Sequence, residues 1–116
     1  MPHAEDQMTS PGYVIALTTL PADADVDAFG RALVEERLAA CVNVLPEMIS
    51  IYRWEAKVEK AAERQVIIKT TAARLADLRE RIRQLHTYDV PEFLVISILD
   101  GSEEYLKWVG ESTRRG

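Results

Sequence analysis

A chain of 116 residues has the size of one domain and is long enough to bury a hydrophobic core without disulfide bridges. Its composition, 47% hydrophobic and 28% charged residues, is ordinary for a globular domain. The net charge of -5 argues against a nucleic-acid partner, because binding phosphates requires a basic surface. An acidic chain is compatible with attracting cations, although many inert surfaces are equally acidic.

The sequence favours a cytoplasmic protein without a membrane partner. Its one cysteine, Cys41, cannot close a disulfide within the chain, so a reducing compartment is expected. The N-terminus lacks the basic and apolar stretches of a signal peptide. No apolar run reaches the roughly 18 residues that a membrane helix needs.

The first part of the chain predicts a tail, a strand and a helix. Residues 1–11 are polar and proline-flanked, so we expect a disordered tail before a single domain over residues 12–113. Residues 12–20 form a nearly continuous apolar run, which is typical of a strand buried on both faces. Acidic residues then precede an amphipathic helix expected over residues 23–38.

A long strand is expected next, over residues 41–54. Pro46 interrupts it and marks a bulge or an edge, because proline cannot donate a ladder hydrogen bond. The chain then turns at residues 55–56, where a positive φ without glycine would cost about 1 kcal/mol. Residues 57–63 are charged and alanine-rich and leave a frayed strand, a bulge or a mobile loop open. Residues 65–70 predict a firm strand.

The last part of the chain predicts a helix, a strand and a final helix. Apolar residues at spacings of three, four and three form the stripe Leu75, Leu78, Ile82 and Leu85. Thr70 or Thr71 is expected to cap this helix. A connector over residues 86–90 leads to a strand over residues 93–99. Ser102 can cap the final helix, which is expected to bury Tyr105, Trp108 and Val109 or their neighbours.

The order β-α-β-β-α-β plus a C-terminal helix predicts an α+β fold, the ferredoxin-like split βαβ sandwich. Right-handed crossovers place both helices on one face of a four-stranded antiparallel sheet. The other face then needs a cover, and the long strands, Trp54, Trp108 and the final helix are candidates to supply it by self-association. A β-arm that overhangs its own sheet is typical of pairing with another chain.

Four separated segments resemble the CutA divalent-cation tolerance family. They are LVEERLAACVNVLPEMISIYRWE at 33–55, VIIKTT at 66–71, LHTYDVPE at 85–92 and YLKWV at 105–109. The resemblance covers about residues 13–113. It implies a homotrimer whose strands add edge to edge, a response to metal ions, and no enzymatic activity. It also implies a similarity in architecture to PII-type signalling proteins.

A metal site has little support from the residues alone, because the chain has no CxxC, no HxxxH and no cluster of cysteine and histidine. In the CutA family, some members bind metal through a cysteine at the end of the first strand and a histidine pair. The matching positions here are Thr18 and Leu85-His86, so only His86 remains as a metal candidate, for copper or another divalent cation. The alternative is a connector histidine that is hydrogen-bonded or solvated.

The resemblance further implies an inter-subunit pocket. Its positions correspond to Tyr52, Trp54, Lys69, His86, Tyr88 and Glu92. Aromatic walls, one cation, one imidazole and one carboxylate suit a small polar or anionic ligand, or a hydrated cation. The alternative is that Tyr52 and Trp54 bury at a trimer contact while Lys69 pairs with Glu92 across the sheet.

Cys41 joins the ligand-binding candidates, although burial as a small apolar residue is the competing interpretation. No cofactor is obligatory in this reading. The leading hypothesis is a trimeric binding or regulatory module with weak metal association. Two alternatives stay open: a PII-like small-molecule sensor or structural scaffold trimer without metal, and a small-molecule enzyme that uses His86 and Glu92.

Overall fold

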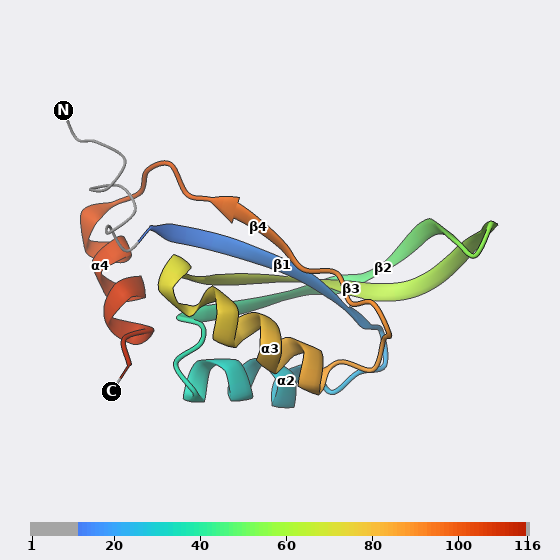
Figure 1. Ribbon diagram of the computed structural model, residues 1–116, viewed down its shortest axis with the longest axis horizontal. Helices are drawn as coiled ribbons and strands as arrows, with labels where there is room; N and C mark the ends of the chain where they lie inside the picture. The colour runs from blue at the N-terminus through green and yellow to red at the C-terminus, as the bar shows by residue number, and fades with distance from the viewer. Residues whose placement is uncertain (1–11, 116) are drawn as a thin grey trace.

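The computed structural model describes residues 12–115, so the predicted tail over residues 1–11 lies outside the described residues. Along the chain (Figure 1) the elements are β1 (Tyr13–Pro21), α2 (Val26–Glu35), β2 (Cys41–Trp54), β3 (Lys57–Thr71), the 3-10 helix η1 (Ala72–Arg74), α3 (Leu75–Leu85), β4 (Leu94–Ser97) and α4 (Glu103–Ser112). The predicted β-α-β-β-α-β order with a terminal helix is therefore confirmed.

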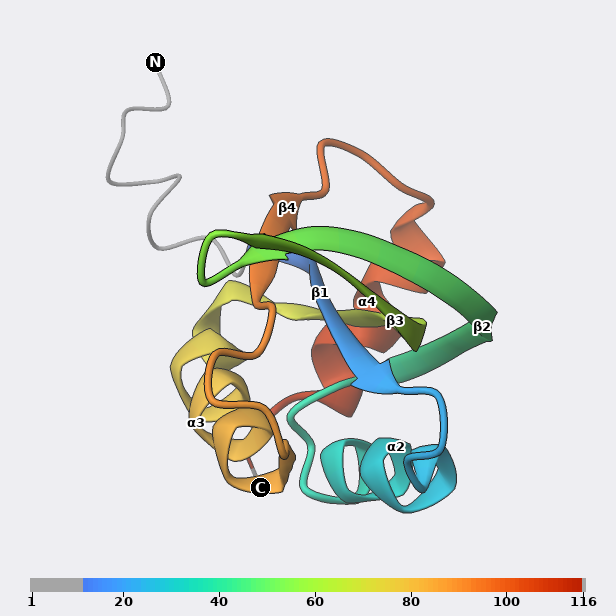
Figure 2. The ribbon, with the colours of Figure 1, turned by 90° about the vertical axis from the view of Figure 1, so that its right-hand side faces the viewer.

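The strands form one antiparallel sheet in the order β2-β3-β1-β4. The helices α2 and α3 lie side by side under one face of this sheet (Figure 2). The helix α4 packs at the end of the sheet where β1 begins and β3 ends (Figure 1). This is the α+β arrangement of a split βαβ sandwich, in which β2 and β4 form the two edges.

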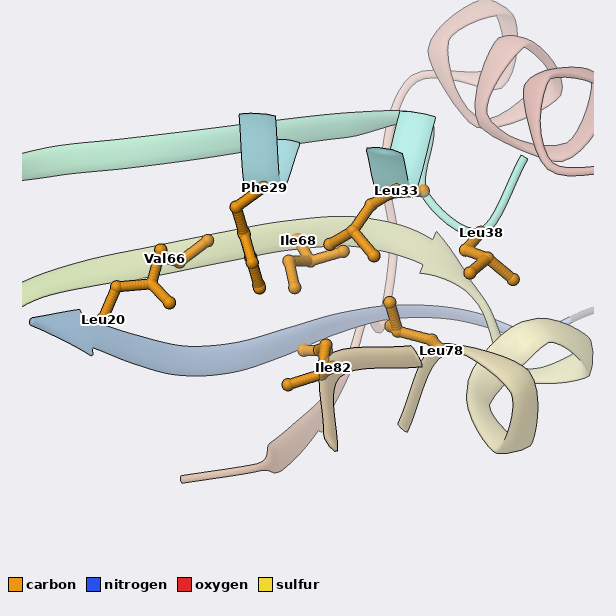
Figure 3. Close-up of a cluster of buried hydrophobic side chains, with 10 residues drawn as sticks. Leu20, Phe29, Leu33, Leu38, Val66, Ile68, Leu78 and Ile82 are labelled. Carbon is orange, nitrogen blue, oxygen red and sulfur yellow. The ribbon is translucent and has the colours of Figure 1, made fainter. Parts of the chain in front are cut away.

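The hydrophobic core lies between the sheet and the two helices (Figure 3). Its buried side chains are Ala16, Leu20, Phe29, Leu33, Leu38, Ala39, Val66, Ile68, Leu78 and Ile82. The stripe predicted for the second helix is confirmed, since Leu78 and Ile82 are buried and Leu75 and Leu85 pack against the cluster. Because strand side chains alternate between faces, this packing leaves the opposite face of the sheet without helix cover over most of its length.

The helix α2 is shorter than the predicted span of 23–38. It begins after Asp25, whose side chain accepts a hydrogen bond from the backbone N–H of Ala28 at 3.0 Å. It ends in a Schellman motif, in which Leu38 N–H bonds to Leu33 O and Arg37 N–H to Val34 O. Arg37 occupies the left-handed position of this motif with φ 60°, which glycine usually fills. No glycine marks this stop in the sequence, so the predicted helix extends past its actual end.

The strands β2 and β3 are continuous as far as their shared turn, and residues 57–63 are strand rather than loop. The register shifts between Val44 and Glu47, which confirms the bulge predicted at Pro46. Pairing of β3 with β1 ends at Glu63, so residues 49–62 project beyond the sheet as a two-stranded arm (Figure 1). At its tip, residues 55–56 have φ values of 50° and 66°. Both central residues of the turn therefore have positive φ, as a type I′ hairpin requires.

The C-terminal elements differ from expectation in detail. The strand β4 covers Leu94–Ser97 rather than 93–99. In α4 the predicted burial holds for Val109, whereas Tyr105 and Trp108 are 43% and 44% exposed in the single chain. A single short helix covers too little of the sheet to enclose both rings.

The predicted threonine cap of the second helix is also wrong. Thr70 instead donates from its hydroxyl to the carbonyl of Leu38 at 2.8 Å, and its side chain is fully buried. Thr71 precedes η1 without a side-chain capping bond and lies 3.5 Å from the Thr113 hydroxyl. These two threonines connect β3 to the end of α2 and to α4.

Candidate functional site

A pocket of about 590 Å³ lies where the arm meets the connector between α3 and β4. In Figure 1 the orange connector after α3 passes the base of the arm. The pocket is lined by Thr19, Tyr52, Trp54, Glu63, Thr87, Tyr88, Asp89, Val90, Pro91 and Glu92. Four of the predicted binding residues, Tyr52, Trp54, Tyr88 and Glu92, therefore lie together.

The Tyr88 hydroxyl donates a hydrogen bond to Oε2 of Glu63 at 2.8 Å. Burial of the phenol and the adjacent Glu63 carboxylate raise the pKa of Tyr88 to about 12. Glu63 itself is only 8% exposed, and no described residue donates a hydrogen bond to its other oxygen, Oε1. The phenol is a neutral donor, so this contact leaves the charge of the carboxylate uncompensated.

Both ring nitrogens of His86 contact the backbone. Nε2 lies 2.5 Å from the carbonyl oxygen of Thr19, and Nδ1 accepts from the Tyr88 N–H at 3.1 Å. Accepting at Nδ1 and donating at Nε2 defines a neutral imidazole in one tautomer. The ring also packs against Tyr88 in a tilted arrangement, with centroids 4.6 Å apart and an interplanar angle of 47°. His86 thus fastens the connector to the end of β1 and fixes the wall of the pocket.

Glu92 lies at the C-terminal end of the connector that begins with His86. Like Glu63, it accepts a hydrogen bond from a neutral donor. Its Oε2 accepts from the Gln65 amide at 2.9 Å, and the same amide nitrogen donates to Thr18 O at 2.8 Å. The proposed pairing of Lys69 with Glu92 is not found, because Lys69 instead lies 5.8 Å over the Tyr105 ring. The carboxylate of Glu92 is oriented without being neutralised.

Cys41 and Lys69 lie together, away from the pocket. They are cross-strand partners at the end of the sheet near α4, and neither lines the pocket. The Cys41 thiol is half-buried and lies 3.7 Å from the Asn43 side-chain oxygen. The structure therefore divides the predicted binding set into two groups, and the roles of Cys41 and Lys69 stay predictions.

The residues present do not fit a closed metal site. No group of three or more His, Cys, Asp or Glu side chains within residues 12–115 is placed to hold a metal ion. Both His86 nitrogens are engaged, and Thr18, the position of the family's cysteine, is fully buried. By strand alternation Thr18 faces the helix layer with Ala16 and Leu20. Metal binding at His86 stays a prediction that would require breaking one of its hydrogen bonds.

Sequence reasoning missed Glu63, the carboxylate at the base of the arm. A signal for it existed in the hairpin. A two-residue turn at 55–56 fixes the register, which places Glu63 opposite Met48 and on the face that carries Tyr52 and Trp54. With a frayed strand, a bulge and a mobile loop all left open for residues 57–63, the sequence assigned no register that would place Glu63 on this face.

A larger hollow, about 920 Å³, lies beside α4 at the other end of the molecule. Its walls mix Arg74 and Lys107 with Asp100 and Glu103. Arg74 is already bonded to the Arg37 carbonyl and to Asp77. The smaller pocket is the better candidate because it gathers aromatic rings and carboxylates that lack charged partners.

Over residues 12–115, no helix has the length and apolar character to cross a membrane.

Comparison with known proteins agrees with this fold. The model of the CutA1 divalent ion tolerance protein family matches residues 14–112. A relative named divalent-cation tolerance protein CutA, from Thermus thermophilus, is 43% identical over 99 residues, which are 85% of this chain and 96% of that protein. The solved Thermus thermophilus structure superimposes with a TM-score of 0.85 at 42% identity, covering 88% of this chain and 99% of that one.

A second solved structure, described as a PII-like protein CutA from Nostoc, has a TM-score of 0.80 at 37% identity and covers 87% of this chain and 97% of that one. The family match extends over nearly all of the described chain and includes the arm, the connector and α4. The chain therefore belongs to the CutA1 divalent ion tolerance protein family.

Proposed function

We propose that this protein acts in divalent-cation tolerance as a homotrimeric, non-catalytic binding module, with its ligand pocket at the cleft between subunits. The observation that carries the proposal is the pocket at the base of the arm. There, Tyr52, Trp54 and Tyr88 leave about 43%, 46% and 36% of their surface exposed beside the buried Glu63. Large aromatic side chains with this much exposure are typical of binding surfaces.

Self-association is supported by apolar surface that one chain leaves uncovered. On the outer face of the arm, Ile51 is 70% and Val58 is 68% exposed, and in β4 Leu94 is 56% exposed. Both β4 and the arm have free backbone edges. An apolar strand with a free edge is a ready template for pairing with a second copy. A trimer built this way covers the arm and the open face of the sheet together.

The non-catalytic role is supported by the contacts of the two candidate catalytic groups. His86 uses both nitrogens on backbone groups, and Glu92 is bonded to Gln65. General acid–base catalysis requires a group within hydrogen-bond reach of the substrate proton. In this arrangement His86 has no free nitrogen, so only Oε1 of Glu92 is without a hydrogen bond from a described residue, and the two groups cannot act as an acid–base pair.

Metal association is expected to be weak, because both nitrogens of His86 are already hydrogen-bonded. The carboxylates of the pocket can attract a divalent cation that keeps most of its water ligands, without forming a closed site. Copper prefers imidazole and thiolate ligands. His86 and Cys41 lie in different parts of the fold, so they cannot serve one copper ion within one chain.

Two measurements test the proposal. Light scattering with size exclusion should give a mass about three times the 13.1 kDa of one chain. Deleting the arm tip over residues 54–60 should weaken assembly, and a monomeric intact chain would end the edge-pairing argument. Calorimetric titration of the intact protein with copper(II), repeated on His86→Ala, should show at most weak binding. Micromolar binding that depends on His86 would instead establish a metal site.

A further inference from the structure

The pocket at the base of the arm carries negative charge that nothing in the described chain neutralises. Its acidic side chains are Glu63, Asp89 and Glu92, and no lysine or arginine lines it. None of the three appears in an ion pair among residues 12–115. Glu63 and Glu92 accept hydrogen bonds only from the neutral groups of Tyr88 and Gln65.

Burial increases the effect of this charge. Glu63 is only 8% exposed, and its Oε1 has no hydrogen-bond donor among the described residues but is not a fully buried atom. Because this oxygen still reaches the pocket, it can accept from a ligand, and the low exposure of the carboxylate strengthens its attraction for a positive charge. This oxygen belongs to a side chain that lines the pocket, so a cationic hydrogen-bond donor in the pocket would satisfy it.

Aromatic rings form the rest of the wall. Tyr52 and Trp54 project from the arm, and Tyr88 projects from the connector. Aromatic faces attract cations through the ring quadrupole and also accept apolar groups. Carboxylates beside several aromatic rings favour a ligand that combines positive charge with an apolar body.

Other ligand classes fit this wall less well. A small anion would approach uncompensated carboxylates with no cationic side chain to bind it. A directly coordinated metal ion needs several donors converging on one point, and residues 12–115 provide no such group. An organic cation needs only one carboxylate contact and a ring face, which this pocket offers.

We propose that the pocket between the arm and the connector binds a small organic cation, an ammonium or guanidinium group on an apolar body. Glu63 Oε1 accepts a hydrogen bond from a head group that carries N–H, and lies in contact with a quaternary ammonium that carries none. Tyr52 and Trp54 pack against the apolar part of the ligand. The inference rests on the proposed function, because it specifies the ligand class of that same pocket.

The test compares two ligands of equal shape. Choline and its uncharged isostere 3,3-dimethyl-1-butanol are titrated into the intact protein, with Trp54 fluorescence as the readout. Agmatine serves as a guanidinium probe and inorganic phosphate as an anion probe. We expect choline and agmatine to bind about tenfold more tightly than the isostere, with a dependence on salt, and phosphate not to bind. The variant Trp54→Phe should abolish the signal, which locates it at the pocket rather than at Trp108.

Two variants test the carboxylates. Glu63→Gln and Glu92→Gln should each weaken choline binding, Glu63→Gln by about tenfold, because each removes a negative charge that attracts the quaternary ammonium head. The matched control Glu104→Gln removes an exposed acid in the first turn of α4, away from the pocket, and should bind choline as the unaltered protein does. If Glu63→Gln fails to fold, the comparison of choline with its isostere on the unaltered chain still decides the question.

The outcomes separate the inference from the proposed function. Equal binding of choline and the isostere, lost in Trp54→Phe, would keep the pocket and overturn its preference for cations. Binding of phosphate but of neither cation would also overturn the inference while keeping a binding module. No response to choline or agmatine would overturn the inference as well, and the trimer measured by light scattering would remain to judge the assembly.

Discussion

The hydroxyl of Tyr88 lies 2.8 Å from Oε2 of Glu63 and donates to it. This bond joins the connector after α3 to the base of the arm, two segments 25 residues apart in sequence. It also fixes one rim of the pocket, because both residues line it. The position of the aromatic wall is thus tied to a single buried carboxylate, and the bond can be tested by changing either partner.

Tyr88→Phe should lower the free energy of unfolding by about 1 kcal/mol at neutral pH, because Glu63 loses its hydrogen-bond donor. The pKa of Tyr88 is raised to about 12 in the fold, against about 10 in the unfolded chain. The protonated phenol is therefore favoured by folding. Its contribution is fully present below pH 10 and is lost as the pH rises through 12. Urea unfolding of the two proteins at a series of pH values should show their difference shrinking over that window.

A matched variant, Tyr105→Phe, removes a hydroxyl on α4 for which the described residues provide no hydrogen bond. It should leave the stability and its pH dependence unchanged. Absorbance titration should show the step near pH 12 in the unaltered protein and in Tyr105→Phe, but not in Tyr88→Phe. A step near 12 that survives in Tyr88→Phe would assign the raised pKa to another tyrosine.

His86→Ala should loosen the connector rather than the core. The imidazole bonds to Thr19 O and to the Tyr88 N–H, so its removal frees both backbone groups at once. We expect a loss of about 1 to 2 kcal/mol in stability and faster amide exchange over residues 87–92. Hydrogen–deuterium exchange measures this directly, with Gln84→Ala on the exposed face of α3 as the control. Unchanged exchange over the connector would show that other contacts hold it.

The sequence predicted the parts of the fold that depend on the periodicity of apolar side chains. The apolar stripe of α3 and the bulge at Pro46 follow from side-chain spacing and from the chemistry of proline, and both are confirmed. The strand β1 is predicted to be buried on both faces, but Tyr13, Ile15 and Leu17 are only partly buried, because no helix covers that face of the sheet. The end of α2 could not be predicted in this way. Arg37 adopts a positive φ there because tertiary contacts hold it, and its side chain bonds to the carbonyls of Glu111 and Ser112 at the end of α4.

The candidate site was predictable in part for the same reason. The predicted residues Tyr52, Trp54, Tyr88 and Glu92 line one pocket, and their binding role stays a prediction. Glu63 was not predicted, because the composition of residues 57–63 leaves strand, bulge and loop open. The separation of Lys69 from Glu92 could not be foreseen, since it depends on where α4 places the Tyr105 ring. Long-range placement of side chains, rather than element type, is what the sequence left undetermined.

Thr18→Val should stabilise the protein by about 1 kcal/mol. The Thr18 hydroxyl is fully buried and is the one buried side-chain oxygen in residues 12–115 without a hydrogen-bond partner. Valine keeps the shape and removes the cost of burying an unpaired polar group. The matched control is Thr70→Val, where the equally buried hydroxyl donates to Leu38 O. That variant should instead lose about 1 kcal/mol or more, and urea unfolding of both would contradict the argument if they moved in the same direction.

The arm tip provides the last prediction, since Ala56 has a φ of 66° at an exposed position. A left-handed conformation costs an L-residue about 1 to 2 kcal/mol, and glycine avoids that cost. Glycine also makes the unfolded chain more flexible, which opposes the gain by about 0.5 to 1 kcal/mol. Ala56→Gly should therefore stabilise the protein by about 0.5 kcal/mol.

The matched control is Ala62→Gly, at a paired position of β3 without a positive φ. It carries only the flexibility cost and should destabilise the protein. Thermal unfolding of both variants should be compared at one protein concentration, because an oligomer's stability depends on it. Equal losses in the two variants would mean that the turn relaxes away from positive φ in solution.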